Sequence, residues 1–100
     1  MHFRATLLLF FVTAVCALLN APVFAQDGAT IYKTKCSACH GAEGQGKIGP
    51  ALKGTSLSAD DIAILLTKGN DAKKPPHKRP LNGLSDADAK AVADYVKTLK

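Results

Sequence analysis

The five-residue segment 36–40 constrains this chain most. It contains two cysteines three residues apart, Cys36 and Cys39, and His40 directly follows the second. This Cys-x-x-Cys-His spacing is the attachment signature of a c-type haem. Each thiol can form a thioether with a haem vinyl group, and the adjacent imidazole then reaches the iron as an axial ligand. The motif therefore predicts one covalently bound haem c and one-electron redox chemistry.

Two other uses of these residues are open at this point. In an oxidising compartment Cys36 and Cys39 could form a disulfide, but a disulfide leaves His40 without a role, and no thioredoxin-like strand–helix pattern surrounds the pair. A zinc ion would need His77 as its fourth ligand, yet zinc sites usually group their ligands in two close pairs. A haem accounts for the motif more fully than either alternative.

The first 25 residues have the pattern of a secretory signal peptide. A short basic start precedes an apolar run over residues 5–19, and Val23 and Ala25 have the spacing of a cleavage site before Gln26. The apolar run is shorter than the roughly 20 residues that span a bilayer. We therefore expect residues 1–25 to be cleaved and the protein to be periplasmic or otherwise exported, rather than held by an uncleaved membrane anchor.

Residues 26–100 would then form a single small domain. All 8 acidic residues and all but one of the 13 basic residues fall within it. A domain of this size buries too little surface to be comfortably stable on its own and usually needs a covalent or metal-based staple. A haem bonded to two cysteines would supply that staple and much of the core.

The pattern predicts an all-α domain with three main helices. The first runs from Asp27, a plausible N-cap, to about Lys35. The second begins after the N-cap Ser58 and stops at Gly69, and the third begins after the N-cap Ser85. The third helix has an apolar stripe at helical spacing, made of Val92, Tyr95, Val96 and Leu99.

Two irregular segments separate these helices. Residues 41–55 are rich in glycine, which allows the backbone to pack closely around a flat ligand. Residues 70–83 contain three prolines, which block regular structure. No helix or strand is therefore expected in either segment.

The whole of residues 26–100 resembles the small monohaem cytochromes c of class I. Four features carry the resemblance in the family's order: Gly28-x-x-x-Tyr32-x-x-x-Cys36, then Cys36 to Gly41, then Ile48-Gly49-Pro50-Ala51-Leu52, and finally Leu84-Ser85-Asp86 followed by residues 92–99. The resemblance implies the cytochrome c fold, wrapped around one covalently attached haem. It also implies an electron-transfer protein rather than an enzyme.

The resemblance further implies roles for individual residues. Cys36, Cys39 and His40 would attach and ligate the haem. The carbonyl of Pro50 would accept a hydrogen bond from Nδ1–H of His40, which fixes the imidazole tautomer. Gly28 would let the first helix cross closely over the last.

The chain departs from the family pattern at the second axial ligand. The family usually places a methionine about seven residues before the Leu that precedes the last helix, but the only methionine here is Met1. Counting back from Leu84 gives His77, so we predict a six-coordinate centre with His40 and His77 on the iron. The alternative ligands are a nearby lysine (Lys73, Lys74 or Lys78), a nearby asparagine (Asn70 or Asn82) or water.

The ligand set decides the expected chemistry. Two imidazoles favour ferric iron more than His plus Met, so the reduction potential should be lowered. If His77 is not on the iron, a five-coordinate or water-bound haem enzyme or gas sensor for peroxide, NO or CO becomes the alternative.

The basic residues that flank His77 suggest electron donor and acceptor proteins with acidic docking surfaces. Nucleic-acid binding is not expected, since the charges are few and not interleaved with aromatic residues. No stable membrane insertion is expected once the signal peptide is removed.

Overall fold

The computed structural model describes residues 27–100, and the predicted signal peptide with its cleavage site lies outside this range. Within it the chain forms one segmented N-terminal helix and two further helices, with no strand. The N-terminal helix consists of α2 (Gly28–Ile31), the π-helical turn η1 (Tyr32–Cys36) and α3 (Ser37–His40), and the others are α4 (Ala59–Lys68) and α5 (Asp86–Thr98). The all-α fold expected from the sequence is therefore confirmed.

The helix starts follow the capping residues. The side chains of Asp27, Ser58 and Ser85 each accept a hydrogen bond from a backbone N–H in the first turn of their helices. These bonds satisfy donors that have no partner within the helix. Gly69, at a φ of 71°, ends α4 as expected. All three predicted N-caps are confirmed.

The first helix is longer than the sequence analysis predicts. It does not end near Lys35 but continues through the Cys-x-x-Cys-His motif to His40, where Gly41 follows at a φ of 88°. No glycine or proline stands between Tyr32 and His40 to stop it. The hydroxyls of Thr34 and Ser37 donate to backbone carbonyls one turn earlier, which supports the wide turn η1.

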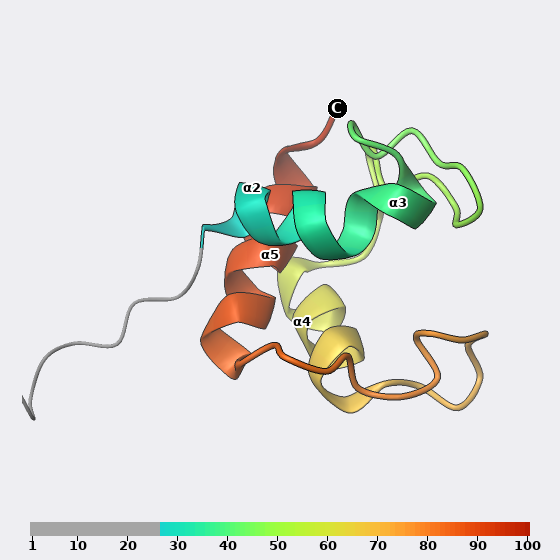
Figure 1. The fold of residues 1–100 in the computed structure, drawn as a ribbon, viewed down its shortest axis with the longest axis vertical. Helices are drawn as coiled ribbons and strands as arrows, with labels where there is room; N and C mark the ends of the chain where they lie inside the picture. The colour runs from blue at the N-terminus through green and yellow to red at the C-terminus, as the bar shows by residue number, and fades with distance from the viewer. Residues whose placement is uncertain (1–26) are drawn as a thin grey trace, which may run out of the picture.

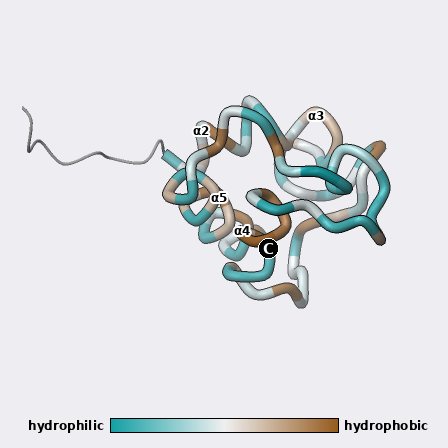
Figure 2. The backbone as a smooth tube through the Cα atoms, turned by 90° about the horizontal axis from the view of Figure 1, so that it is seen from below, coloured by the Kyte–Doolittle hydropathy of each residue, from teal (hydrophilic) through white to brown (hydrophobic). Residues whose placement is uncertain are grey.

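The core lies where the helices cross. α5 packs against both α2 and α4, and Figure 1 shows α2 lying across α5, with α4 beside α5 and α3 at the far end of the N-terminal helix. In Figure 2 hydrophobic segments lie at this crossing. The buried hydrophobic residues come from α2, η1, α4 and α5: Ile31, Tyr32, Ile62, Leu66, Ala89, Val92, Ala93 and Val96.

Gly28 sits at the closest approach between the first and last helices. A Cβ at this position would lie 2.9 Å from the carbonyl carbon of Ala91 and 3.1 Å from Cβ of Tyr95. Only glycine leaves room for this contact. The rings of Tyr32 and Tyr95 pack beside it with their centroids 5.5 Å apart.

Two long loops leave the helices on the same side of the molecule. One follows α3 and the other joins α4 to α5, and Figure 1 shows both loops to the right of the helices, one above the other. The fold thus places the Cys-x-x-Cys-His motif and the loop with His77 on opposite walls of one cavity.

No helix among residues 27–100 is long and apolar enough to cross a membrane.

Candidate functional site

An open cavity of about 560 Å³ occupies the space between the two loops. Its floor is formed by the buried side chains of Ile62, Leu66, Val92 and Val96 from α4 and α5. Cavities of this size with apolar walls and a few convergent polar groups are typical of cofactor sites. All five site residues expected from the sequence line it: Cys36, Cys39, His40, Pro50 and His77.

The two cysteines lie on the wall formed by the N-terminal helix. Cys36 is partly buried and Cys39 is exposed, and the two thiols are free. Burial raises the pKa of the Cys36 thiol, and the neighbouring Lys35 ammonium partly offsets that effect. Since residues three apart share a helix face, both sulfur atoms can reach one flat ligand in the cavity.

His40 is held in a fixed orientation. The residue is 9% exposed, and its Nδ1 lies 2.7 Å from the carbonyl oxygen of Pro50. A carbonyl oxygen only accepts, so Nδ1 carries a proton and Nε2 is the ring nitrogen left to bind a metal ion. This is the contact that the family resemblance implies for Pro50.

The backbone of Gly49 closes against the face of the His40 ring. A Cβ on Gly49 would lie 2.8 Å from Cε1 and 3.0 Å from Nδ1 of His40, closer than a side chain allows. The Gly49 N–H also donates to the Cys39 carbonyl over 2.8 Å. The loop after α3 therefore packs directly on the imidazole and restricts its rotation.

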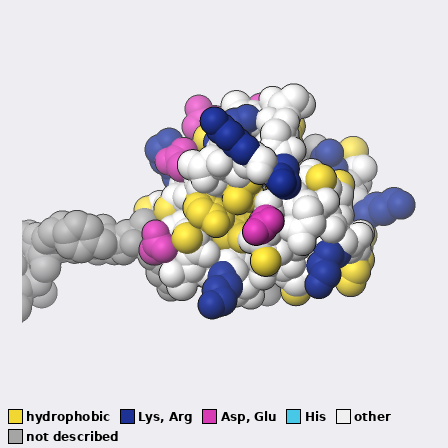
Figure 3. Space-filling view, turned by 90° about the horizontal axis from the view of Figure 1, so that it is seen from above, with side chains coloured by type: hydrophobic (Ala, Val, Ile, Leu, Met, Phe, Trp, Pro, Cys, Tyr) yellow, Lys and Arg dark blue, Asp and Glu magenta, His cyan; other side chains and the backbone are white. Residues whose placement is uncertain are grey.

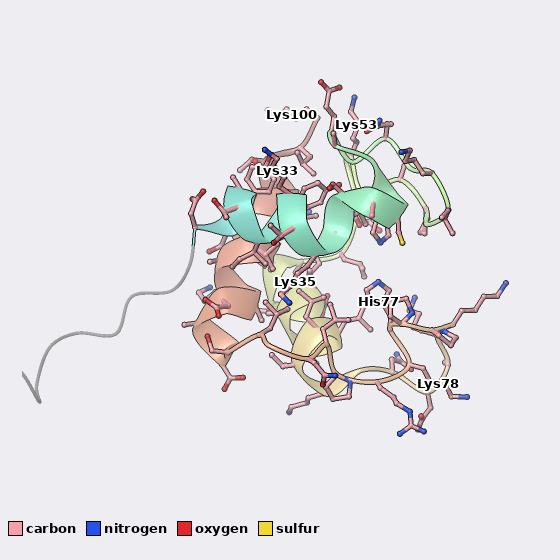
Figure 4. The ribbon with its side chains drawn as sticks, in the orientation of Figure 1. Lys33, Lys35, Lys53, His77, Lys78 and Lys100 are labelled. Atoms are coloured by element: carbon pink, nitrogen blue, oxygen red, sulfur yellow. The ribbon has the colours of Figure 1, made fainter. Side chains whose placement is uncertain are left out.

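His77 faces His40 from the opposite wall. The two ring centroids are 6.0 Å apart and the ring planes differ by 33°. Figure 4 shows the His77 side chain extending from its loop toward α3, whereas the neighbouring Lys78 points away. Imidazole nitrogens bind first-row metals at about 2 Å, so two rings that share one metal ion have centres about 6 Å apart.

The environment of His77 favours its neutral form. Burial lowers the pKa of His77 below its ordinary value, and the charges of His40 and Lys73 lower it further. Neutral imidazole is the form that binds a metal ion. The His77 Nδ1 atom is buried and has no hydrogen-bond partner, which distinguishes this ring from that of His40.

The donor set fits a haem better than a zinc ion. Among residues 27–100 no three His, Cys, Asp or Glu side chains converge as ligands of one metal ion, so the four-ligand zinc arrangement is not present. Two imidazoles on opposite walls of an apolar cavity, with two thiols at its side, match the needs of a flat ligand with axial coordination.

The other side chains considered as ligands of the iron divide into those that line the cavity and those that do not. Lys73 and Lys74 line the cavity, but Lys78, Asn70 and Asn82 do not. Lys35 lines it as well, although nothing in the sequence pattern indicates this position. Its position depends on the turn of a helix that was expected to end there, so no local signal identified it.

Comparisons with known proteins agree with this geometry. The family described as cytochrome C oxidase, cbb3-type, subunit III matches residues 24–96. Cytochrome c-551 of Stutzerimonas stutzeri is 35% identical over 92 residues, which cover 84% of this chain and 88% of that protein. Cytochrome c-552 of Nitrosomonas europaea is 37% identical over 99 residues, covering 87% and 91%. Cytochrome c-551 of Azotobacter vinelandii is 31% identical over 83 residues, covering 75% and 100%.

Proposed function

Since this chain belongs to the small monohaem class I cytochromes c, we propose that it is an electron carrier whose haem iron is held between His40 and His77. The chain is a small c-type cytochrome with one covalently bound haem c, and it takes part in electron transfer. The proposal goes beyond the family in naming the second ligand and its consequence for the reduction potential. Bound haem iron supplies the exchange of single electrons.

One observation carries the proposal, namely the two imidazoles that face each other at 6.0 Å across the cavity. In this arrangement Cys36 and Cys39 would hold the haem by thioether bonds, and His40 and His77 would bind its iron. Pro50 keeps the proton on Nδ1 of His40 and strengthens its donation through Nε2. Iron that kept both imidazoles in either oxidation state would suit outer-sphere electron transfer.

The ligand pair should lower the reduction potential. Methionine ligation raises the potential of haem iron relative to histidine, so a second imidazole stabilises the ferric state. We therefore expect a lower potential than that of an otherwise similar His/Met protein.

Replacing His77 by methionine tests the ligand assignment. His77→Met should raise the potential by the order of 100 mV, a fraction of the roughly 0.8 V over which axial ligands move haem potentials. Lys78→Met is the matched control, because it adds the same thioether one residue along on a side chain that points away. If a redox titration gave both variants the same reduction potential, position 77 would not face the iron.

The basic residues at the cavity support a partner with an acidic surface. Lys35, Lys73 and Lys74 are exposed and line the cavity, whereas Lys33, Lys53 and Lys100 lie on the far side of α3 in Figure 4. Figure 3 shows the face at the C-terminal end, where basic side chains surround a small hydrophobic cluster but acidic ones also occur. We propose that the cavity side, rather than this end, orients the redox partner.

Export is part of the same proposal. The pattern of residues 1–25 and a motif that takes a covalent haem both favour a periplasmic or otherwise exported protein. The intact mass of the protein isolated with its haem checks this. Loss of residues 1–25 would support cleavage, and their retention would favour a membrane anchor.

One observation favours a second candidate, a haem protein that binds a small gas. Nδ1 of His77 has no hydrogen-bond partner, which leaves this ring a weaker donor than His40. Exogenous CO would then displace it from ferrous iron. Rapid CO binding by the unmodified protein would favour this candidate, and slow binding would favour the electron carrier.

A further inference from the structure

The base of the loop that carries His77 is closed by an unusually tight backbone contact. Gly69 adopts a φ of 71° and lies against the returning chain. A Cβ on Gly69 would stand 2.6 Å from both Cα and the carbonyl carbon of Arg79, and 2.8 Å from the Lys78 carbonyl oxygen. The atoms in the way are backbone atoms, which cannot turn aside as a flexible side chain can.

This contact adjoins the hydrogen bonds that hold the His77 backbone. The Asn70 N–H donates to the His77 carbonyl over 2.9 Å, and the His77 N–H donates to the Lys74 carbonyl over 3.1 Å. The ring itself has no such support, because its buried Nδ1 has no partner. The position of the imidazole is therefore set by its backbone, and the backbone is set by the closure at Gly69.

We propose that Gly69 is a positioning residue for the distal ligand, since the closeness of its contact with Arg79 determines how far His77 reaches toward the iron. The proposal rests on the proposed role of His77 as an axial ligand. A single methyl group at position 69 should separate the two ends of the loop and withdraw the imidazole. The proximal side should be unaffected, because His40 is held by Gly49 and Pro50 on a different loop.

The chain offers a matched control for this test. Gly54 has a similar φ of 64°, but no atom outside its sequence neighbours lies within 4 Å of where its Cβ would be. Gly54→Ala therefore places a side chain at a similar positive φ without the contact, whereas Gly69→Ala adds the contact with Arg79 and a ψ of 179°, which at positive φ is open essentially to glycine alone. Gly54→Ala controls for the loss of a glycine at positive φ, and any further change in Gly69→Ala reports on the backbone at the closure of the loop.

The experiment compares the haem-loaded wild type with both variants. Gly69→Ala should add a high-spin component to the ferric EPR spectrum and accelerate CO binding to the ferrous protein about tenfold, equivalent to about 1.4 kcal/mol of lost ligand affinity. Gly54→Ala should match the wild type in both measurements. A Gly69→Ala protein that matches the wild type would overturn the proposal, and so would a Gly54→Ala protein with the same changes as Gly69→Ala.

A milder pair of variants decides the matter if Gly69→Ala yields no holoprotein. The Asn70 side-chain oxygen accepts from the Ala72 N–H over 2.9 Å, so Asn70→Ala loosens the same turn while Asn70→Asp keeps the acceptor. Asn70→Ala should accelerate CO binding and Asn70→Asp should restore the wild-type rate, whereas equal rates in both would overturn the proposal. A wild type without a bis-imidazole spectrum would overturn the ligation of His77 first and this role of Gly69 with it.

Discussion

The two imidazoles that face each other across the cavity are held in very different ways. His40 ends a helix, lies nine-tenths buried, donates from Nδ1 to Pro50 and packs against the backbone of Gly49. His77 stands on a loop, is only partly buried and has no partner for Nδ1. The comparison indicates that the cavity wall with His40 is fixed, whereas the wall with His77 is adjustable.

The loops around the two residues differ in the same sense. The loop after α3 is tied to the rest of the fold, since Tyr32 donates from its hydroxyl to the Gly41 carbonyl and Gly54 donates to the carbonyl of Leu99. The loop with His77 is bonded mostly to itself, apart from a bond to α4 and an exposed 3.4 Å contact of Lys35. Regions with few external bonds open at lower free energy than the core does.

The largest expected effect comes from deleting each imidazole in turn. His40→Ala should lower the free energy of unfolding by more than about 4 kcal/mol or prevent assembly of the holoprotein, because a buried ligand and its contacts are lost. His77→Ala should cost only about 1–2 kcal/mol while converting the iron from low spin. Denaturant unfolding of the ferric proteins checks both values, and equal losses would show that the walls do not differ as described.

An intermediate effect is expected from a methyl group on the fixed wall. Gly49→Ala places a Cβ 2.8 Å from Cε1 of His40, and such overpacking costs about 1–3 kcal/mol. The iron should remain low spin, since His40 is restrained on its other sides. Denaturant unfolding together with the ferric absorption spectrum measures the two outcomes. Release of the axial ligand by Gly49→Ala, with no loss of stability, would reverse the assignment of fixed and adjustable walls.

The smallest effect on stability is expected from the charges beside His77. Lys74→Glu should change the free energy of unfolding by less than about 0.5 kcal/mol, because the side chain is exposed. It should nevertheless slow oxidation of the ferrous protein by the anion ferricyanide severalfold at low salt, and high salt should remove the difference. Lys100→Glu, on the far side of α3 in Figure 4, is the control, and an equal slowing by both variants would mean that only net charge matters.

The scaffold was largely predictable because its signals are local. Asp27, Ser58 and Ser85 cap their helices through contacts within one turn, which the sequence displays directly. The predicted buried stripe on α5 was only partly right. Val92 and Val96 are buried as predicted, but two residues outside the predicted stripe, Ala89 and Ala93, are buried as well. Small alanines do not stand out in a pattern of hydrophobic residues, although they are what allows helices to pack closely.

The site likewise has one part that local sequence signals predict and one part that they do not. The motif around His40 is contiguous, so the order of its residues is enough to indicate its chemistry. His77 could be predicted by counting back from Leu84, but its placement relative to His40 could not, because it depends on how the loop folds, and the contact of Gly69 with Arg79 joins residues ten apart in the chain. The missing partner of the His77 Nδ1 atom likewise depends on the packed neighbours of the loop, which no local pattern specifies.

The most direct test of the proposed ligation is low-temperature EPR of the ferric wild-type protein, isolated with its haem attached. His40 and His77 on opposite sides of the iron predict a low-spin signal characteristic of two imidazoles. A predominantly high-spin signal would contradict this ligation, because it would mean that His77 does not bind the iron.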